Sequence, residues 1–240
     1  MKTIGLIGGV SWESSSEYYR LINQAVKSQL GALHSAELVM YSLDFEPVAR
    51  LEHDEEWDRL SEVLGTAAHK LELAGASFVL IASNTLHKVV PQVQQQLGIP
   101  IVHIADAVAE AVASAGVSTL GLLGTNFVME QAFYRERLER HGLKIITPPK
   151  KARDFIHNVI YGELALGDIR QTSRTRILEM IGDLKNEGAE GIVLANTELP
   201  LLIRAAEIPM TLFDSMAIHI DKAVALALGT EAVQQMETKQ

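Results

Sequence analysis

Two short polar segments each follow a strongly apolar run and carry side chains that could bind a small anion. Ser83-Asn84-Thr85 comes directly after 78–82, and Asn196-Thr197-Glu198 comes directly after 191–195. In open α/β sheets, ligands bind beyond the carboxyl ends of the strands, where such hydroxyls and amides would contact a substrate. The same residue types also cap the N-termini of helices, so a structural role and a binding role are both open for each segment.

A glycine-containing segment, Gly8–Glu13, follows the first apolar run and precedes a helix whose start is marked by Ser14 and Glu17 in capping-box spacing. Glycines let the backbone approach a ligand closely, although they also serve a simple tight turn. The spacing is not the G-x-G-x-x-G pattern of dinucleotide-binding proteins. A similar segment, Gly124–Asn126, follows a later apolar run, and this recurrence favours ligand binding.

Short apolar runs alternate with longer amphipathic segments, which predicts an α/β fold with mostly parallel sheets covered by helices. The predicted strands are Thr3–Ile7, Glu37–Ser42, Phe78–Ala82, Ile101–Ile104, Leu120–Leu123, Gly191–Ala195 and Met210–Phe213. The predicted helices are Glu17–Gln29, Trp57–Leu73, Asp106–Ser114, Met129–Arg140, Arg153–Glu163, Ser173–Asn186 and Ala217–Leu228.

The chain also repeats itself. Thr3–Gly8 matches Thr119–Gly124, Gly75–Ser83 matches Gly188–Asn196, and an Ile-Pro pair follows at 99 and at 208. Ordered matches at nearly constant spacing indicate two similar halves. We therefore predict two pseudo-symmetric lobes, each a mostly parallel sheet flanked by helices, with their polar loops facing a shared cleft. Lobe one would comprise 1–105 plus the C-terminal helix at about 210–229, and lobe two 106–209.

Composition excludes several classes of function. The formal net charge of −9 argues against nucleic acid as a partner. No apolar run approaches the ~20 residues that span a bilayer, and the N-terminus does not resemble a secretory signal, so we expect a cytoplasmic protein without a membrane partner. The chain contains no cysteine, and its histidines lack the paired spacing of a metal site, so no metal is expected.

The polar segments resemble those of the aspartate/glutamate racemase superfamily in the same order along the chain. The resemblance rests on Ile7–Ser14 with Tyr18-Tyr19, Asn84–Lys88, His103–Asp106, Leu123–Thr125 and Thr197–Leu202. It implies two pseudo-symmetric α/β lobes, a homodimer, and racemisation of aspartate, glutamate or a similar small dicarboxylate in the inter-lobe cleft. It implies no cofactor, and no Schiff-base lysine with a phosphate site for pyridoxal phosphate is recognisable.

The sequence departs from the family pattern at the proton carriers. In the family a cysteine precedes each Asn-Thr and Thr-Glu pair; one thiolate removes the α-proton and the opposite thiol returns one. Here the two catalytic positions hold Ser83 and Asn196. A serine hydroxyl is far less acidic than a thiol and needs an adjacent base, and an asparagine amide cannot exchange a proton in this role.

Four hypotheses stay open. The chain could catalyse related chemistry with other acids or bases, bind a substrate naturally without turnover, carry deliberate replacements of the cysteines, or serve in protein interaction. The candidate acids or bases are Glu13, Asp44, His87 and Glu198.

The resemblance also predicts the residues that bind substrate. Asn84, Thr85, Thr125 and Thr197 would bind the carboxylate and amino groups, with Glu198 beside them. Ser11 and Trp12 would form one wall. A side-chain carboxylate needs a cation, for which the candidates are Arg50, Lys88 and Arg153.

Overall fold

The computed structural model describes residues 1–230. The contacts within the chain divide it into two compact units. Unit 1 contains Met1–Ala82, Leu86–His103 and the chain from His219; unit 2 contains Ser83–Thr85 and Ile104–Ile218. Within residues 1–230, no helix is both long enough and apolar enough to cross a membrane.

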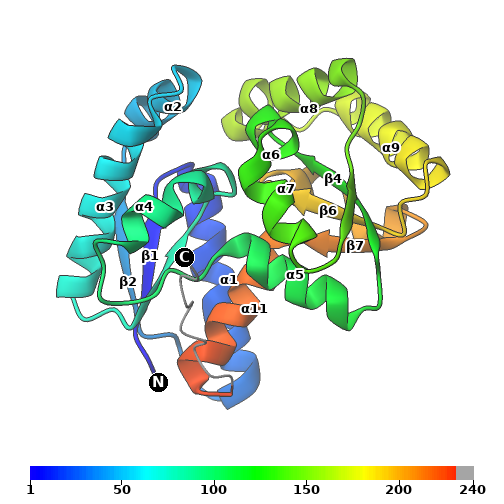
Figure 1. Ribbon diagram of the computed structural model, residues 1–240. Helices are drawn as coiled ribbons and strands as arrows, with labels where there is room; N and C mark the ends of the chain where they lie inside the picture. Colours follow the sequence, from blue (N-terminus) through cyan, green and yellow to red (C-terminus); the bar gives the residue numbers. More distant parts are fainter. Residues whose placement is uncertain (231–240) are drawn as a thin grey trace. The chain divides into compact units, whose positions relative to one another are not determined.

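Unit 1 is built on a parallel sheet of three strands in the order β2-β1-β3. The strands are β1 (Ile4–Gly8), β2 (Leu38–Ser42) and β3 (Phe78–Ile81). β1 and β3 are buried along their whole length, as expected for strands covered by helices on both faces. Figure 1 shows α1 (Trp12–Leu30) and α3 (Trp57–Leu73) on opposite sides of this sheet.

The remaining helical segments of unit 1 are short, apart from the last. They are α2 (Phe45–His53), η1 (Thr85–Val89), which begins with the last residue of the unit 2 segment Ser83–Thr85, α4 (Val90–Gln94), and the part of α11 (Ser215–Leu228) that starts at His219.

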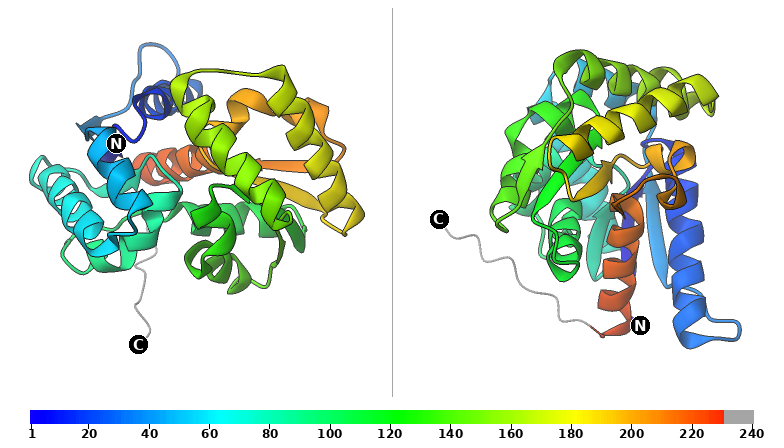
Figure 2. Two further views of the ribbon diagram at one scale, coloured as in Figure 1. Left: turned by 90° about the horizontal axis from the view of Figure 1, so that it is seen from above. Right: turned by 90° about the vertical axis from the view of Figure 1, so that its right-hand side faces the viewer.

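Unit 2 is built on a parallel sheet of four strands in the order β5-β4-β6-β7. The central strand β6 alternates its side chains between two cores, as the period of a strand requires. Ile192 and Leu194 pack with α8 and α9, whereas Val193 and Ala195 pack with α5 and α7. These two pairs of helices therefore cover opposite faces of the sheet (Figure 2).

The elements of unit 2 have the following bounds. The strands are β4 (Thr119–Gly124), β5 (Lys144–Ile146), β6 (Gly191–Ala195) and β7 (Thr211–Asp214). The helices are α5 (Ile104–Ser114), α6 (Asn126–Glu130), α7 (Ala132–Glu139), α8 (Lys150–Gly162), η2 (Leu164–Leu166), α9 (Gln171–Asn186), α10 (Leu199–Leu202) and η3 (Ala205–Glu207).

The two sheets share one topology, which confirms the predicted α/β fold with repeated halves. β1 and β4 each pair with the two strands that follow them in their own unit. β7 adds a fourth strand beside β6, and at the corresponding place beside β3 unit 1 has a single bridge between Val79 and Ile101. The predicted strand Ile101–Ile104 was wrong beyond this bridge, because α5 already begins at Ile104.

The boundaries of the units differ from those of the predicted lobes at three places, the smallest being that unit 2 begins at Ile104 rather than at 106. Met210–Ile218 belongs to unit 2 rather than with lobe one, because β7 pairs with β6. Ser83–Thr85 also belongs to unit 2, although it follows the unit 1 strand β3. The side-chain hydrogen bonds of Asn84 and Thr85, described next, account for this last difference.

Candidate functional site

The loop after β1 contains a glycine whose backbone conformation and surroundings leave no room for a side chain. Gly9 has a φ of +84°, and a Cβ at this position would lie 2.0 Å from the carbonyl oxygen of Leu43. The Gly9 N–H donates to the Ser15 Oγ at 2.7 Å, and that hydroxyl donates to the carbonyl of Ser11 at 2.7 Å. The loop is thus fixed to the first turn of α1.

The predicted binding residues of this loop differ in exposure. Ser11 is buried and caps α1, since its Oγ accepts the N–H of Ser14. Trp12 is 70% exposed, and Glu13 lies half-buried in the first turn of α1. The predicted helix start at Ser14 and Glu17 was wrong, because α1 already begins at Trp12 with Ser11 as its cap. Trp12 offers an indole face to solvent.

Asn84 is buried and makes two side-chain hydrogen bonds within unit 2. Its Oδ1 accepts the hydroxyl of Tyr134 at 3.1 Å, and its Nδ2 donates to the Ser215 Oγ at 3.0 Å. Complete burial raises the pKa of Tyr134, and the nearby Asp106 carboxylate raises it further, so this phenol stays protonated. The structure thus brings to Asn84 two residues that sequence reasoning missed.

Thr85 and Thr125 lie together although they are 40 residues apart. Both are buried, and their Oγ1 atoms are 3.0 Å apart. The Thr125 Oγ1 also accepts the N–H of Val128 at 3.4 Å, which caps the short helix α6. Two of the predicted binding residues therefore form one hydroxyl pair.

The loop after β6 contains a set of hydrogen bonds among its own residues. The Asn196 Oδ1 accepts the backbone N–H groups of Glu198, at 3.0 Å, and Leu199, at 2.9 Å. The Glu198 Oε2 accepts the Asn196 Nδ2 at 2.9 Å and the Thr197 Oγ1 at 2.8 Å. All three polar side chains are buried. Asn196 thus acts as a cap for the chain entering α10.

Ser83 lies in the connection between β3 and η1, and His87 lies within η1. Ser83 is half-buried and directly follows Ala82. His87 is buried in unit 1, where its ring centroid lies 4.7 Å from that of His103 and 5.6 Å from that of His219. His219 is held on both nitrogens, because Tyr18 bonds its Nδ1 and the carbonyl of Val102 accepts from its Nε2. Burial lowers the pKa of His219 to about 4.

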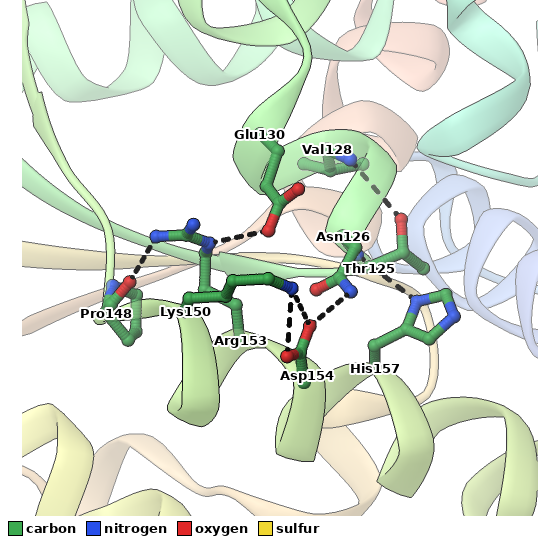
Figure 3. A network of polar contacts seen from close by, with 9 residues as sticks. All are labelled: Thr125, Asn126, Val128, Glu130, Pro148, Lys150, Arg153, Asp154 and His157. Atoms are coloured by element: carbon green, nitrogen blue, oxygen red, sulfur yellow. Dashed lines mark hydrogen bonds and ion pairs between the residues drawn. The ribbon is translucent and has the colours of Figure 1, made fainter.

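The three candidate cations occupy different environments. Arg50 is exposed and pairs with Glu46 one turn away on α2. Lys88 places its Nζ 3.7 Å from the ring centroid of Trp57, and desolvation lowers its pKa while the charge of Glu55 opposes that shift. Arg153 donates to Glu130 and to the carbonyl of Pro148 (Figure 3).

A polar network connects the β4 loop with α8 (Figure 3). The Asn126 Nδ2 donates to Asp154 at 3.0 Å, and the Lys150 Nζ donates to both oxygens of the same carboxylate. The hydrogen bonds from Lys150 and Asn126 lower the pKa of Asp154. The Asn126 backbone N–H donates to the His157 Nδ1 at 3.2 Å. This network fixes the loop that presents Thr125.

The two remaining candidate acids or bases, Asp44 and Glu198, differ in burial. Asp44 caps α2 at the surface, where it accepts the N–H of Glu46. Glu198 is buried, in contrast. Within residues 1–230, no group of three His, Asp or Glu side chains could hold a metal ion.

Comparison with known proteins gives consistent matches. A family model described as Asp/Glu/Hydantoin racemase matches residues 7–223. A crystal structure from Yersinia pestis, whose protein carries the assignment Asp/Glu racemase, is 44% identical and covers 95% of this chain and 100% of its own, with a TM-score of 0.89. An aspartate racemase homologue from Pyrococcus horikoshii is 35% identical at the same coverage of 95% and 100%, with a TM-score of 0.83.

A curated relative is more distant. The broad specificity amino-acid racemase RacX of Bacillus subtilis is 24% identical over 148 residues, which is 60% of this chain. The match spans 63% of the length of that relative, just under two thirds.

Proposed function

Because the chain belongs to the Asp/Glu/hydantoin racemase family, we propose that it is a cofactor-independent racemase of an acidic amino acid or a similar small dicarboxylate. The observation that carries this proposal is the buried hydroxyl pair of Thr85 and Thr125, with Asn84 beside it in the chain. Hydroxyl and amide N–H donors in a buried setting suit a carboxylate, since hydrogen bonds to an ionised acceptor are stronger than neutral ones.

The proton-transfer step needs one group to remove the α-proton and another to return one. Asn196 cannot carry the proton, because its Oδ1 accepts two backbone N–H groups and a carboxamide does not ionise near neutral pH. Glu198 is the best-supported carrier next to this position, because it is a buried carboxyl group two residues after Asn196. Near the other catalytic position, the candidate proton carrier is His87, which is buried and lies four residues after Ser83.

A second function, binding without turnover, is favoured by one observation. Every polar atom of the Asn196 side chain is engaged in holding its own loop, so this position serves structure rather than proton transfer. The protein would then bind the same dicarboxylates and leave the α-proton in place.

Exchange of the α-proton in D₂O, followed by NMR for both enantiomers of aspartate and glutamate, separates the two functions. A racemase exchanges the proton, and Glu198→Gln slows exchange by ~10²-fold or more. The exposed Glu179→Gln on α9 is the matched control. Stabilisation by ligand without exchange supports binding alone; at ~100 times the Kd a ligand adds about 2.7 kcal/mol. If the chain shows neither α-proton exchange nor stabilisation by these ligands, a protein-interaction role becomes the better-supported function.

We infer three further properties from the family resemblance alone. The chain forms a homodimer, which light scattering coupled to size-exclusion chromatography tests. It works in the cytoplasm, and its substrate binds in the predicted inter-lobe cleft. A crystal structure with bound substrate tests the last of these.

A further inference from the structure

The carboxamide of Asn84 has a defined number of free hydrogen-bonding groups. An asparagine side chain offers two N–H donors and one oxygen with two acceptor lone pairs. The Tyr134 hydroxyl donates to one lone pair of the oxygen, and one N–H donates to the Ser215 Oγ. Within residues 1–230, nothing accepts the second N–H of Asn84. The side chain is 3% exposed, so this donor is held in a largely desolvated position.

The two hydroxyls that hold Asn84 are not equivalent. The phenolic O–H of Tyr134 is the better donor, because its oxygen lone pair is delocalised into the ring, whereas the alkyl hydroxyl of Ser215 accepts readily. The pairing therefore favours the amide oxygen facing Tyr134 and the amide nitrogen facing Ser215. Both hydroxyls are fixed in place: Tyr134 packs in the core formed with α5 and β6, and Ser215 is buried at the first position of α11.

We propose that Tyr134 and Ser215 are positioning residues that set the amide of Asn84 so that its remaining N–H donates to a carboxylate oxygen of the substrate. The free N–H of Asn84 can only donate, so through this group Asn84 recognises a carboxylate oxygen and not an ammonium group. This assignment narrows the sequence-based prediction, which left Asn84 to bind either group. It rests on the proposed function for the class of substrate.

The orientation of the amide is testable without any ligand. In NMR spectra of the full chain, the Asn84 side-chain amide protons should show cross-relaxation to the β protons of Ser215 and not to the ring protons of Tyr134. The reverse pattern would overturn the proposal. Tyr134→Phe keeps the packed ring and removes only the hydroxyl, so the Asn84 amide signals should shift. The exposed Tyr19→Phe on α1 should leave them unchanged.

Binding of succinate and of L-aspartate, measured by calorimetry, tests the role in recognition. Loss of one positioning hydrogen bond should weaken both ligands roughly 3- to 10-fold in Tyr134→Phe and in Ser215→Ala, from the typical net strength of such bonds. In an Asn84→Ala background the same two changes should have less than about a 2-fold effect, because the amide they orient is gone.

Each other outcome has a definite meaning. Equal weakening with and without Asn84 would show that Tyr134 acts only through packing, and would overturn the proposal. If the unmodified chain binds neither ligand and exchanges no α-proton, the proposed function fails and the carboxylate assignment fails with it. The amide orientation is still decided by cross-relaxation in that case.

Discussion

The hydroxyl oxygens of Thr85 and Thr125 lie 3.0 Å apart in a buried setting. One hydroxyl must donate to the other, so the pair keeps a single O–H for a ligand. The two threonines were predicted as separate substrate contacts from two loops, but they form one unit with shared donors and acceptors. Their contributions to stability and to binding should therefore depend on one another.

Replacement of these threonines by valine should show that dependence in the free energy of unfolding. Thr85→Val or Thr125→Val alone leaves a buried hydroxyl without its partner, at a cost of about 1–3 kcal/mol. The double variant removes both hydroxyls, so its loss should be well below the sum. Urea unfolding measures all three, with the exposed Thr172→Val on α9 as control. Strictly additive losses would show that the hydroxyls do not interact.

The fold could be predicted where burial alone decides the structure. β1, β3, β4 and β6 are almost wholly buried, so their sequences are continuous apolar runs. β5 was missed because it has three residues and begins with the exposed Lys144. Such an edge strand forms through its pairing with β4, which leaves no local pattern.

Only those site residues that directly follow a strand in the sequence could be predicted. Polar residues after β3, β4 and β6 follow from the rule for parallel sheets. The buried ones are Asn84, Thr85, Thr125, Asn196, Thr197 and Glu198. The partners of Asn84 lie 50 and 131 residues away on α7 and α11. Their role depends on how helices pack, which no local spacing encodes. The pairing of Arg50 with Glu46 could have been predicted from the sequence, since Glu46 lies one helical turn before it.

Gly9 should be far less replaceable than other glycines of positive φ. Gly9→Ala would place its Cβ 2.0 Å from the Leu43 carbonyl oxygen, so the β1 loop must move; we expect a loss of roughly 4 kcal/mol or more, or no folding. Gly116 has a φ of +70° with nothing within 4 Å, so Gly116→Ala should cost only about 1 kcal/mol. Thermal unfolding compares them, and similar losses would contradict the steric argument.

The histidine cluster of unit 1 should make stability fall in mild acid. Burial lowers the pKa of His219 to about 4, so the unfolded chain, with a value near 6.5, binds the proton first. The contribution of neutral His219 to the free energy of unfolding is fully present above pH ~6.5. It is lost as the pH falls toward ~4, which lowers the free energy of unfolding by roughly 3 kcal/mol. His219 contacts the buried side chains of Tyr18 and His87, neither of which is a carboxylate.

His219→Gln removes this titration and retains groups that can bond Tyr18 and the Val102 carbonyl. Its free energy of unfolding should fall less steeply than that of the unmodified chain between pH 6.5 and 4. The exposed His34→Gln should reproduce the original slope. Parallel pH profiles for His219→Gln and the unmodified chain would mean that His219 is not the titrating group.

Asn196→Cys should have opposite effects on stability and on chemistry. The change removes the acceptor of the Glu198 and Leu199 N–H groups, and loss of such a cap costs about 1–2 kcal/mol. Serine and cysteine are similar in volume, so Ser83→Cys should cost less. Together the two changes introduce thiols at both positions where the family pattern places cysteine.

The double variant Ser83→Cys with Asn196→Cys should exchange the substrate α-proton ~10²- to 10⁴-fold faster than the unmodified chain, because a thiol reaches its reactive form far more readily than a hydroxyl or an amide. Each single change should do much less, since the two groups act as a unit. A matched variant with Ser114→Cys and Asn158→Cys places two thiols at exposed positions and should give no increase. If the double variant folds and binds aspartate without faster exchange, these two positions are not the sites of proton transfer, and Glu198→Gln and His87→Asn become the next variants to measure.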